Sequence, residues 1–274
     1  HGVFPPAIAR PLDGVKVLGG PVSTSQSFCS ELVLRRVNRT IELMDSVATI
    51  GDPQSELLLL RACSGISKLY FALRTSPPSA FVSAQTSFDF ALRSSLERIV
   101  TASGPGFGEW QWRLATFPFQ FGGLGVYAVA DVLHYAFIAS RAQTYDLQTQ
   151  LLRPAGIMSP GSTFVAALDV FNEVTGSAMP CDPSEIAAPK LMKKLADIYF
   201  TKVAASSESV FSLTPRQLAL WKSQQEPYTS DWLRAVPIAG LGQTMNGRTY
   251  RCVLSYRLGV PLFRVFLPCP ACSR

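Results

Sequence analysis

Apolar side chains recur every three or four residues along much of this chain, and this periodicity is what most restricts its fold. The clearest run lies between residues 27 and 50, where the apolar positions are Val33, Val37, Ile41, Met44 and Ala48. Because an α-helix has 3.6 residues per turn, these side chains share one face of the run. The run therefore predicts an amphipathic helix that must bury this face against a neighbour.

Proline and glycine divide the rest of the pattern into separate helices. Asp52 followed by Pro53 is typical of a helix start, and Ser76-Pro77-Pro78 and Gly104-Pro105 are typical of helix ends. The predicted helices cover residues 27–50, 53–75, 79–102 and 130–152. Short connections between them favour antiparallel packing, so we expect a small helical bundle.

Two further features set the expected domain organisation. The segment GVKVLGGPV, residues 14–22, is β-branched and glycine-rich, which predicts an extended strand running into a turn. The segment PAGIMSPGS, residues 154–162, has the composition of a linker, and amphipathic patterns follow it. We therefore expect a mainly α fold with an extended segment at 1–26, a helical domain at 27–153 and a second helical region at 154–274.

Residues 103–127 interrupt the helical pattern with closely spaced glycines and seven aromatic rings. The rings are Phe107, Trp110, Trp112, Phe117, Phe119, Phe121 and Tyr127. Such rings can stack on the bases of a single strand, with Arg113 beside them for the phosphates, or they can pack into a core. The glycines at 104, 106 and 108 favour a phosphate-binding loop only weakly, because a helix and not a strand precedes them.

Basic residues are concentrated at the C-terminal end. After Asp231 there is no Asp or Glu, whereas six arginines occur, and without these six the chain has 19 basic and 19 acidic residues. The six are Arg234, Arg248, Arg251, Arg257, Arg264 and Arg274. A local positive charge of this kind favours a polyanion such as nucleic acid, although a solvated arginine-rich surface is the alternative.

Few residues indicate catalysis. The histidines are His1 and His134, and His134 lies in an apolar helical stretch that fits a packed side chain better than the base of a Cys/His hydrolase. No metalloprotease, nucleophile-elbow or Walker A motif occurs. Cys269 and Cys272 have Cys-x-x-Cys spacing, which supplies two of the four ligands that a structural zinc site needs.

The chain has no apolar run long enough to cross a membrane, and its opening residues do not follow the order of a signal peptide. We therefore expect no membrane partner and an intracellular, nuclear or cytoplasmic protein that is not secreted. In such a compartment the six cysteines should be thiols or metal ligands.

Three stretches together resemble the reverse transcriptases of plant LINE-type (non-LTR) retrotransposons, in the region C-terminal to the catalytic palm, from the thumb to the start of the zinc knuckle. The first is GVKVLGGPVS near the N-terminus, and the second is FPFQFGGLGVYAVADVLHYAFIAS at 117–140. The third is the series DWLRAVPI, YRCVLSYRLGVPLF and CPAC within 231–272. The paired catalytic aspartates of that family have no counterpart here. The enzyme class that the resemblance implies is RNA-directed DNA polymerase, and the chain itself is not assigned a catalytic role.

The resemblance implies roles for particular residues. Lys16, Leu18 and Gly19 would lie at a primer grip, and residues 27–153 would be thumb-like. Cys269 and Cys272 would need a His and a Cys further downstream to complete a zinc site, so zinc is expected only if that downstream half is present. The residues expected near phosphate are Arg248, Arg251, Arg257 and Arg264. Arg257 has an alternative role in shaping a helix end.

The expected function is that of a noncatalytic portion of a reverse transcriptase-like protein that braces an RNA or DNA template-primer through its phosphates. The alternative is a helical scaffold or protein-interaction protein derived from a decayed retroelement. The preference for RNA or DNA and the oligomeric state stay open.

Overall fold

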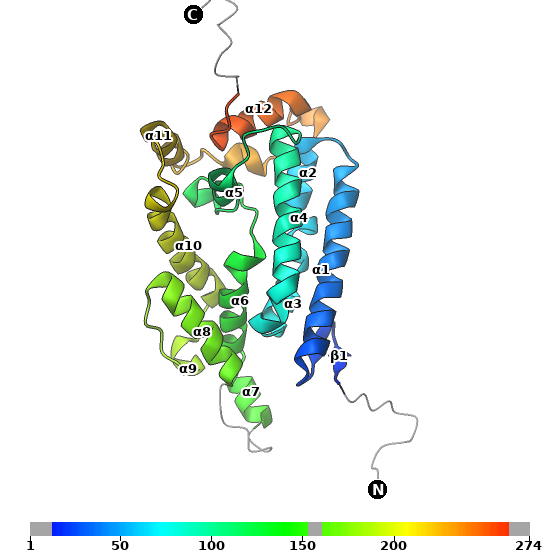
Figure 1. Ribbon diagram of the computed structural model, residues 1–274, viewed down its shortest axis with the longest axis vertical. Coiled ribbons are helices and arrows are strands. Elements are labelled where there is room, and N and C mark those ends of the chain that lie inside the picture. Colours follow the sequence, from blue (N-terminus) through cyan, green and yellow to red (C-terminus); the bar gives the residue numbers. More distant parts are fainter. Residues whose placement is uncertain (1–12, 153–160, 263–274) are drawn as a thin grey trace, which may run out of the picture. The chain divides into compact units, whose positions relative to one another are not determined.

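The computed structural model describes residues 13–152 and 161–262 (Figure 1). Helices make up most of these residues, and one two-stranded sheet precedes them, which confirms the expected mainly α fold with a short extended segment near the N-terminus. The longer α-helices are α1 (Gln26–Ala48), α4 (Val82–Thr101), α6 (Val129–Gln143), α8 (Ser162–Thr175), α10 (Leu191–Val210) and α12 (Gly247–Arg257). The shorter ones are α2 (Pro53–Leu59), α3 (Tyr70–Thr75), α5 (Glu109–Ala115), α7 (Tyr145–Leu152), α9 (Pro183–Ile186) and α11 (Pro215–Ser223).

The helix expected over 53–75 is broken. After α2 the chain forms a π-helical turn at Leu60–Ser64 and a 3₁₀ turn at Ile66–Lys68 before α3 begins. Gly65 lies so close to the preceding turn that a Cβ at this position would be 2.3 Å from the carbonyl oxygen of Leu60. The apolar periodicity continues through this break, which is why the sequence pattern predicted one helix.

The contacts group the chain into two compact units, each built from three segments. Unit 1 comprises His1–Arg39, Leu69–Phe88 and Ala130–Asp197, and unit 2 comprises Thr40–Lys68, Asp89–Val129 and Ile198–Arg274. This grouping differs from the consecutive division into 1–26, 27–153 and 154–274. Most of the expected linker at 154–162 lies outside the described residues.

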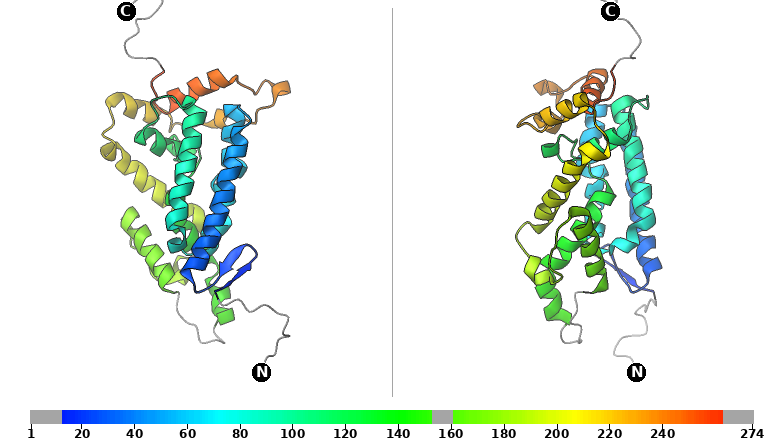
Figure 2. Two further views of the ribbon diagram at one scale, coloured as in Figure 1. Left: turned by 45° about the vertical axis from the view of Figure 1, so that its right-hand side comes forward. Right: turned by 60° about the vertical axis from the view of Figure 1, so that its left-hand side comes forward.

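The extended segment of unit 1 is a β-hairpin and not a single strand. Strands β1 (Val15–Val17) and β2 (Gly20–Val22) pair antiparallel, with Val15 opposite Val22 and Val17 opposite Gly20. Leu18 and Gly19 connect them with φ values of 51° and 92°, which is the geometry of a two-residue type I′ turn. Figure 2 shows the hairpin beside the first turns of α1.

The core of unit 1 is formed by the apolar faces that the periodicity predicts. Val33 and Val37 of α1 are buried, and β2 packs on α3, where Thr75 and Phe71 lie next to Gly20. Helices α6 and α8 supply a further buried set: Val132, Leu133, Ala136, Phe164, Leu168 and Phe171.

The core of unit 2 is aromatic. Trp110 of α5 meets Trp221 of α11 edge-on with ring centroids 5.1 Å apart, and Phe117 stacks on Trp221 at 6.1 Å. Phe107, Trp110 and Phe117 are all buried. These rings of the 103–127 segment therefore pack into the core and are not exposed for stacking on bases.

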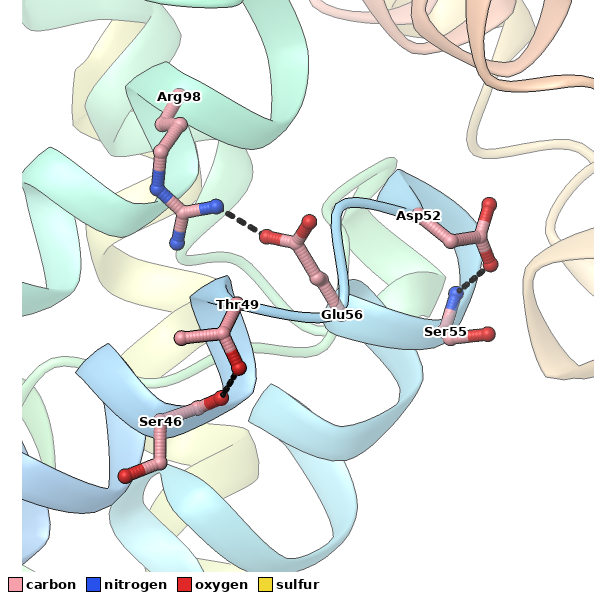
Figure 3. A network of polar contacts seen from close by, with 6 residues as sticks. All are labelled: Ser46, Thr49, Asp52, Ser55, Glu56 and Arg98. Carbon is pink, nitrogen blue, oxygen red and sulfur yellow. Dashed lines mark hydrogen bonds and ion pairs between the residues drawn. The ribbon is translucent and has the colours of Figure 1, made fainter.

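A buried ion pair joins two helices of unit 2. Glu56 of α2 is almost fully buried, and Arg98 of α4 reaches its carboxylate (Figure 3).

The start of α2 is as predicted: Asp52 caps it by accepting a hydrogen bond from the Ser55 amide at 2.9 Å, and Pro53 occupies the first turn.

The start of α11 supplies a testable contribution to stability. Thr214 Oγ1 accepts from the Gln217 amide at 3.3 Å, and Gln217 Oε1 accepts from the Thr214 amide at 3.0 Å, forming a capping box. We expect Thr214→Ala to lower the free energy of unfolding by about 1 kcal/mol, measured by urea denaturation. Thr201→Ala, at an exposed position within α10, is the control and should not destabilise; an equal loss in both variants would contradict the capping role.

Candidate nucleic-acid interface

Helix α12 carries most of the described arginines of the basic C-terminal region. Asn246 caps it by accepting from the Thr249 amide at 2.8 Å, and Gly259, with a φ of 66°, follows its C-terminal end. In unit 2, α12 contacts α2 and lies across the end of α4 (Figure 1). This helix was not predicted, although the Asn cap, the apolar residues Tyr250 and Leu254 and the closing glycine are typical signals of one.

The inner face of α12 buries Arg257. Its Nη1 donates to the carbonyl of Thr229 at 3.2 Å, and its Nη2 donates to the carbonyl of Gly123 at 3.2 Å and to Ser230 Oγ at 2.7 Å. Burial lowers the pKa of Arg257 to about 10, so its guanidinium is still charged at neutral pH. Arg257 therefore has a structural role, although it connects α12 to Gly123, Thr229 and Ser230 instead of shaping a helix end, and its buried side chain is not exposed to a phosphate.

The outer face of α12 forms one wall of an open groove of about 640 Å³. Arg248, Arg251, Cys252 and Ser255 line it from α12, at the three- and four-residue spacing of one helix face. The other walls are the C-terminal end of α4, the loop at Gly104–Gly106 and residues 260–262. All of these residues belong to unit 2.

The two arginines of this groove have no polar partner in the part of the chain that the structure describes. Neither the Arg248 nor the Arg251 guanidinium makes a hydrogen bond or ion pair with any residue that the structure describes, and Arg251 Nε is a buried donor with no partner there. The described lining also contains no carboxylate. Two arginines without a partner among the described residues line one depression, so the groove suits an anionic ligand.

The remaining predicted residues of the described chain do not join this groove. Arg113 is half-buried, donating to Thr116 Oγ1 at 3.0 Å with its guanidinium over the Phe117 ring. Lys16, Leu18 and Gly19 belong to the hairpin of unit 1, where Lys16 is exposed and Leu18 is 91% exposed at the turn. Arg264, Cys269 and Cys272 lie outside the described residues.

No group of three or more His, Cys, Asp or Glu side chains is placed to hold a metal ion within residues 13–152 and 161–262. The zinc ligands expected from the sequence fall outside these ranges, so a zinc site stays a prediction. Cys29, Cys63, Cys181 and Cys252 are free thiols.

His134 lies in a separate groove of unit 1, with a volume of about 510 Å³. Its neighbours in the lining include Pro77, Val82, Leu133 and Val170, and burial lowers the pKa of the imidazole. No cysteine or carboxylate occurs in the described lining, so the groove lacks both the Cys nucleophile and the acidic partner that a Cys/His hydrolase would use.

The comparisons with known proteins give no match: no family model, no curated protein and no solved structure is similar to this chain. Of the helices that the structure describes, none is both long and apolar enough to span a bilayer.

Proposed function

We propose that this chain is a noncatalytic nucleic-acid-binding portion of a reverse transcriptase-like protein of the plant LINE type, which braces template and primer through their phosphates. The observation that carries the proposal is the pair Arg248 and Arg251, whose guanidinium groups face one open groove and have no described protein partner. The ordered sequence resemblance at 14–22, 117–140 and 231–272 supplies the family.

The contrast within α12 supports a ligand role for these two arginines. Arg257, on the same helix, has three hydrogen bonds to protein oxygens, whereas Arg248 and Arg251 have none within the described chain. A phosphodiester supplies the charge-assisted acceptors that guanidinium groups bind best. The absence of acidic residues after Asp231 means that carboxylates of the same segment do not compete for them.

The finer parts of the proposal come from the resemblance. Lys16, Leu18 and Gly19 would contact a primer end, and Arg264 would add a phosphate contact. Cys269 and Cys272 would bind zinc once a His and a Cys complete the site. Such a protein would act inside the cell, in the nucleus or the cytoplasm.

The proposal is tested by fluorescence anisotropy with labelled RNA and DNA oligonucleotides, single-stranded and duplex, at low salt. We expect Arg248→Gln and Arg251→Gln each to weaken binding about tenfold, because each removes a charge-assisted contact. Arg216→Gln is the matched control, since Arg216 is an exposed arginine of α11 outside the groove. An intact protein that binds none of these ligands would contradict the proposal.

A second candidate function, a helical scaffold that binds another protein, is favoured by one observation in unit 1. Val82 is 74% exposed and Val170 is 39% exposed, and both line the largely apolar groove beside His134. A pull-down after nuclease treatment tests it: a partner retained without nucleic acid, and lost on Val82→Asp, would support the scaffold. Partners that appear only when nucleic acid is present would contradict it.

A further inference from the structure

The groove beside α12 is not a purely cationic surface. Its arginines lie on one wall, while Pro105, Pro261 and Leu262 supply exposed apolar surface around them, with the buried Val100 and Val260 behind. Gly106 lets the loop approach closely, since a Cβ there would be 3.0 Å from Val260 Cγ1. A ligand that fills this groove must therefore combine an anionic group with a flat or apolar one.

We propose that the groove binds one unstacked nucleotide of a single-stranded nucleic acid, with its phosphate on Arg248 and Arg251 and its base on the side chains of Pro105, Pro261 and Leu262. This inference rests on the proposed function and names the form of nucleic acid that the site takes. In a duplex the bases are paired and stacked, so its phosphates can reach the arginines but its bases cannot enter the groove.

The size of the groove fits this ligand. Its volume of about 640 Å³ lies within the ~300–1,000 Å³ of sites that enclose small organic molecules. Arg248 and Arg251 are three residues apart on the helix, so their side chains are neighbours and can hold the same phosphate.

The carbonyl groups at the end of α4 do not oppose an anion strongly. A helix C-terminus carries partial negative charge on its unpaired carbonyls. Here Ser255 Oγ donates to the carbonyl of Val100 at 3.2 Å, and the Gly104 amide donates to the carbonyl of Thr101 at 3.0 Å. These two carbonyls are already hydrogen-bonded within the protein, which lessens their repulsion of an anion.

Cys252 reports directly on occupation of the groove. Its thiol is exposed and belongs to the lining, whereas Cys181 is an exposed thiol of unit 1 outside it. In the full chain, alkylation of each cysteine by iodoacetamide is followed by mass spectrometry of the peptides. A single-stranded 12-mer of oligo-dT or oligo-U at about 90% occupancy should slow alkylation of Cys252 about tenfold and leave Cys181 unchanged.

A pair of cysteine variants tests the base pocket. Cys252→Phe fills the groove and should weaken single-strand binding about tenfold without weakening duplex binding, while Cys181→Phe, outside the groove, should bind both as the natural chain does. The thermal unfolding midpoint of each variant shows that it is folded.

The outcomes separate the two proposals. A chain that binds oligonucleotides while Cys252 stays fully reactive, or whose Cys252→Phe variant keeps its single-strand affinity, overturns the nucleotide pocket and leaves the proposed function standing. Equal protection of Cys252 by duplex at the same occupancy also overturns it. A chain that binds no oligonucleotide in anisotropy overturns the proposed function and the pocket together.

Discussion

Replacing Arg257 with leucine lowers the free energy of unfolding by about 3–5 kcal/mol, the largest effect that we expect from a single substitution in α12. The side chain is 4% exposed, and its guanidinium donates to the carbonyls of Gly123 and Thr229 and to Ser230 Oγ. Leucine removes all three donated bonds: the Gly123 carbonyl loses the partner that the structure shows for it, whereas the Thr229 carbonyl keeps its hydrogen bond from Trp232 Nε1 and Ser230 Oγ keeps its bond to the Phe119 carbonyl. An unsatisfied buried acceptor costs about 1–3 kcal/mol.

The reason for this sensitivity lies in the Gly-Gly-Leu-Gly turn. A Cβ at Gly123 would be 1.9 Å from the carbonyl oxygen of Phe117, so the chain folds back on itself at a distance that only glycine permits. Arg257 then joins this turn to α12 through the Gly123 carbonyl. A hydrogen bond thus connects two of the stretches on which the resemblance rests, residues 117–140 and 231–272.

The control for Arg257→Leu is Arg248→Leu, on the same helix. Arg248 is exposed and has no described protein partner, so its replacement should change the free energy of unfolding by no more than about 0.5 kcal/mol. Urea unfolding followed by circular dichroism measures both variants. A loss below about 1 kcal/mol for Arg257→Leu would contradict its structural role.

The second large effect is expected from Arg98→Met, which lowers the free energy of unfolding by about 3–5 kcal/mol at neutral pH. The side chain of Glu56 is 2% exposed, and its carboxylate pairs with Arg98 (Figure 3). Methionine keeps much of the length of the arginine side chain but leaves a buried carboxylate without its counter-ion. Breaking a buried pair in this way costs far more than the pair itself contributes.

An exposed ion pair of the same chain provides the comparison. Arg35 and Glu31 of α1 are paired at 3.2 Å with side chains 57% and 66% exposed. Arg35→Met should therefore change stability by about 0.5 kcal/mol or less, because solvent screens this pair. Equal losses for Arg35→Met and Arg98→Met would show that burial of Glu56 does not set the effect.

Helices with clear caps and a continuous apolar face could be predicted from the sequence. The helix expected over 27–50 is α1, and α2 starts at Asp52 as the Asp-Pro pair predicted. The break at Gly65 could not be predicted, because it depends on how closely the backbone approaches Leu60. The same holds for α5, which the glycine and aromatic composition of 103–127 concealed.

The candidate site was predicted only in part. Counting charges identified the arginines after Asp231 but treated them alike, because their helix had not been recognised. The structure separates them by their position around the axis of α12: Arg248 and Arg251 line the groove, and Arg257 is on the buried face. The apolar walls contributed by α4 and the Gly104–Gly106 loop are distant in sequence from these arginines, so no local pattern could have indicated the groove.

The salt dependence of oligonucleotide binding tests the central claim, that Arg248 and Arg251 bind phosphate. The logarithm of the binding constant should fall linearly with the logarithm of the salt concentration. Because the two arginines hold one phosphate, the double variant Arg248→Gln/Arg251→Gln should have a slope shallower by about 0.7, the value for one single-strand phosphate contact. A slope that is the same in the natural chain and in the double variant, or no dependence on salt in either, would contradict the claim.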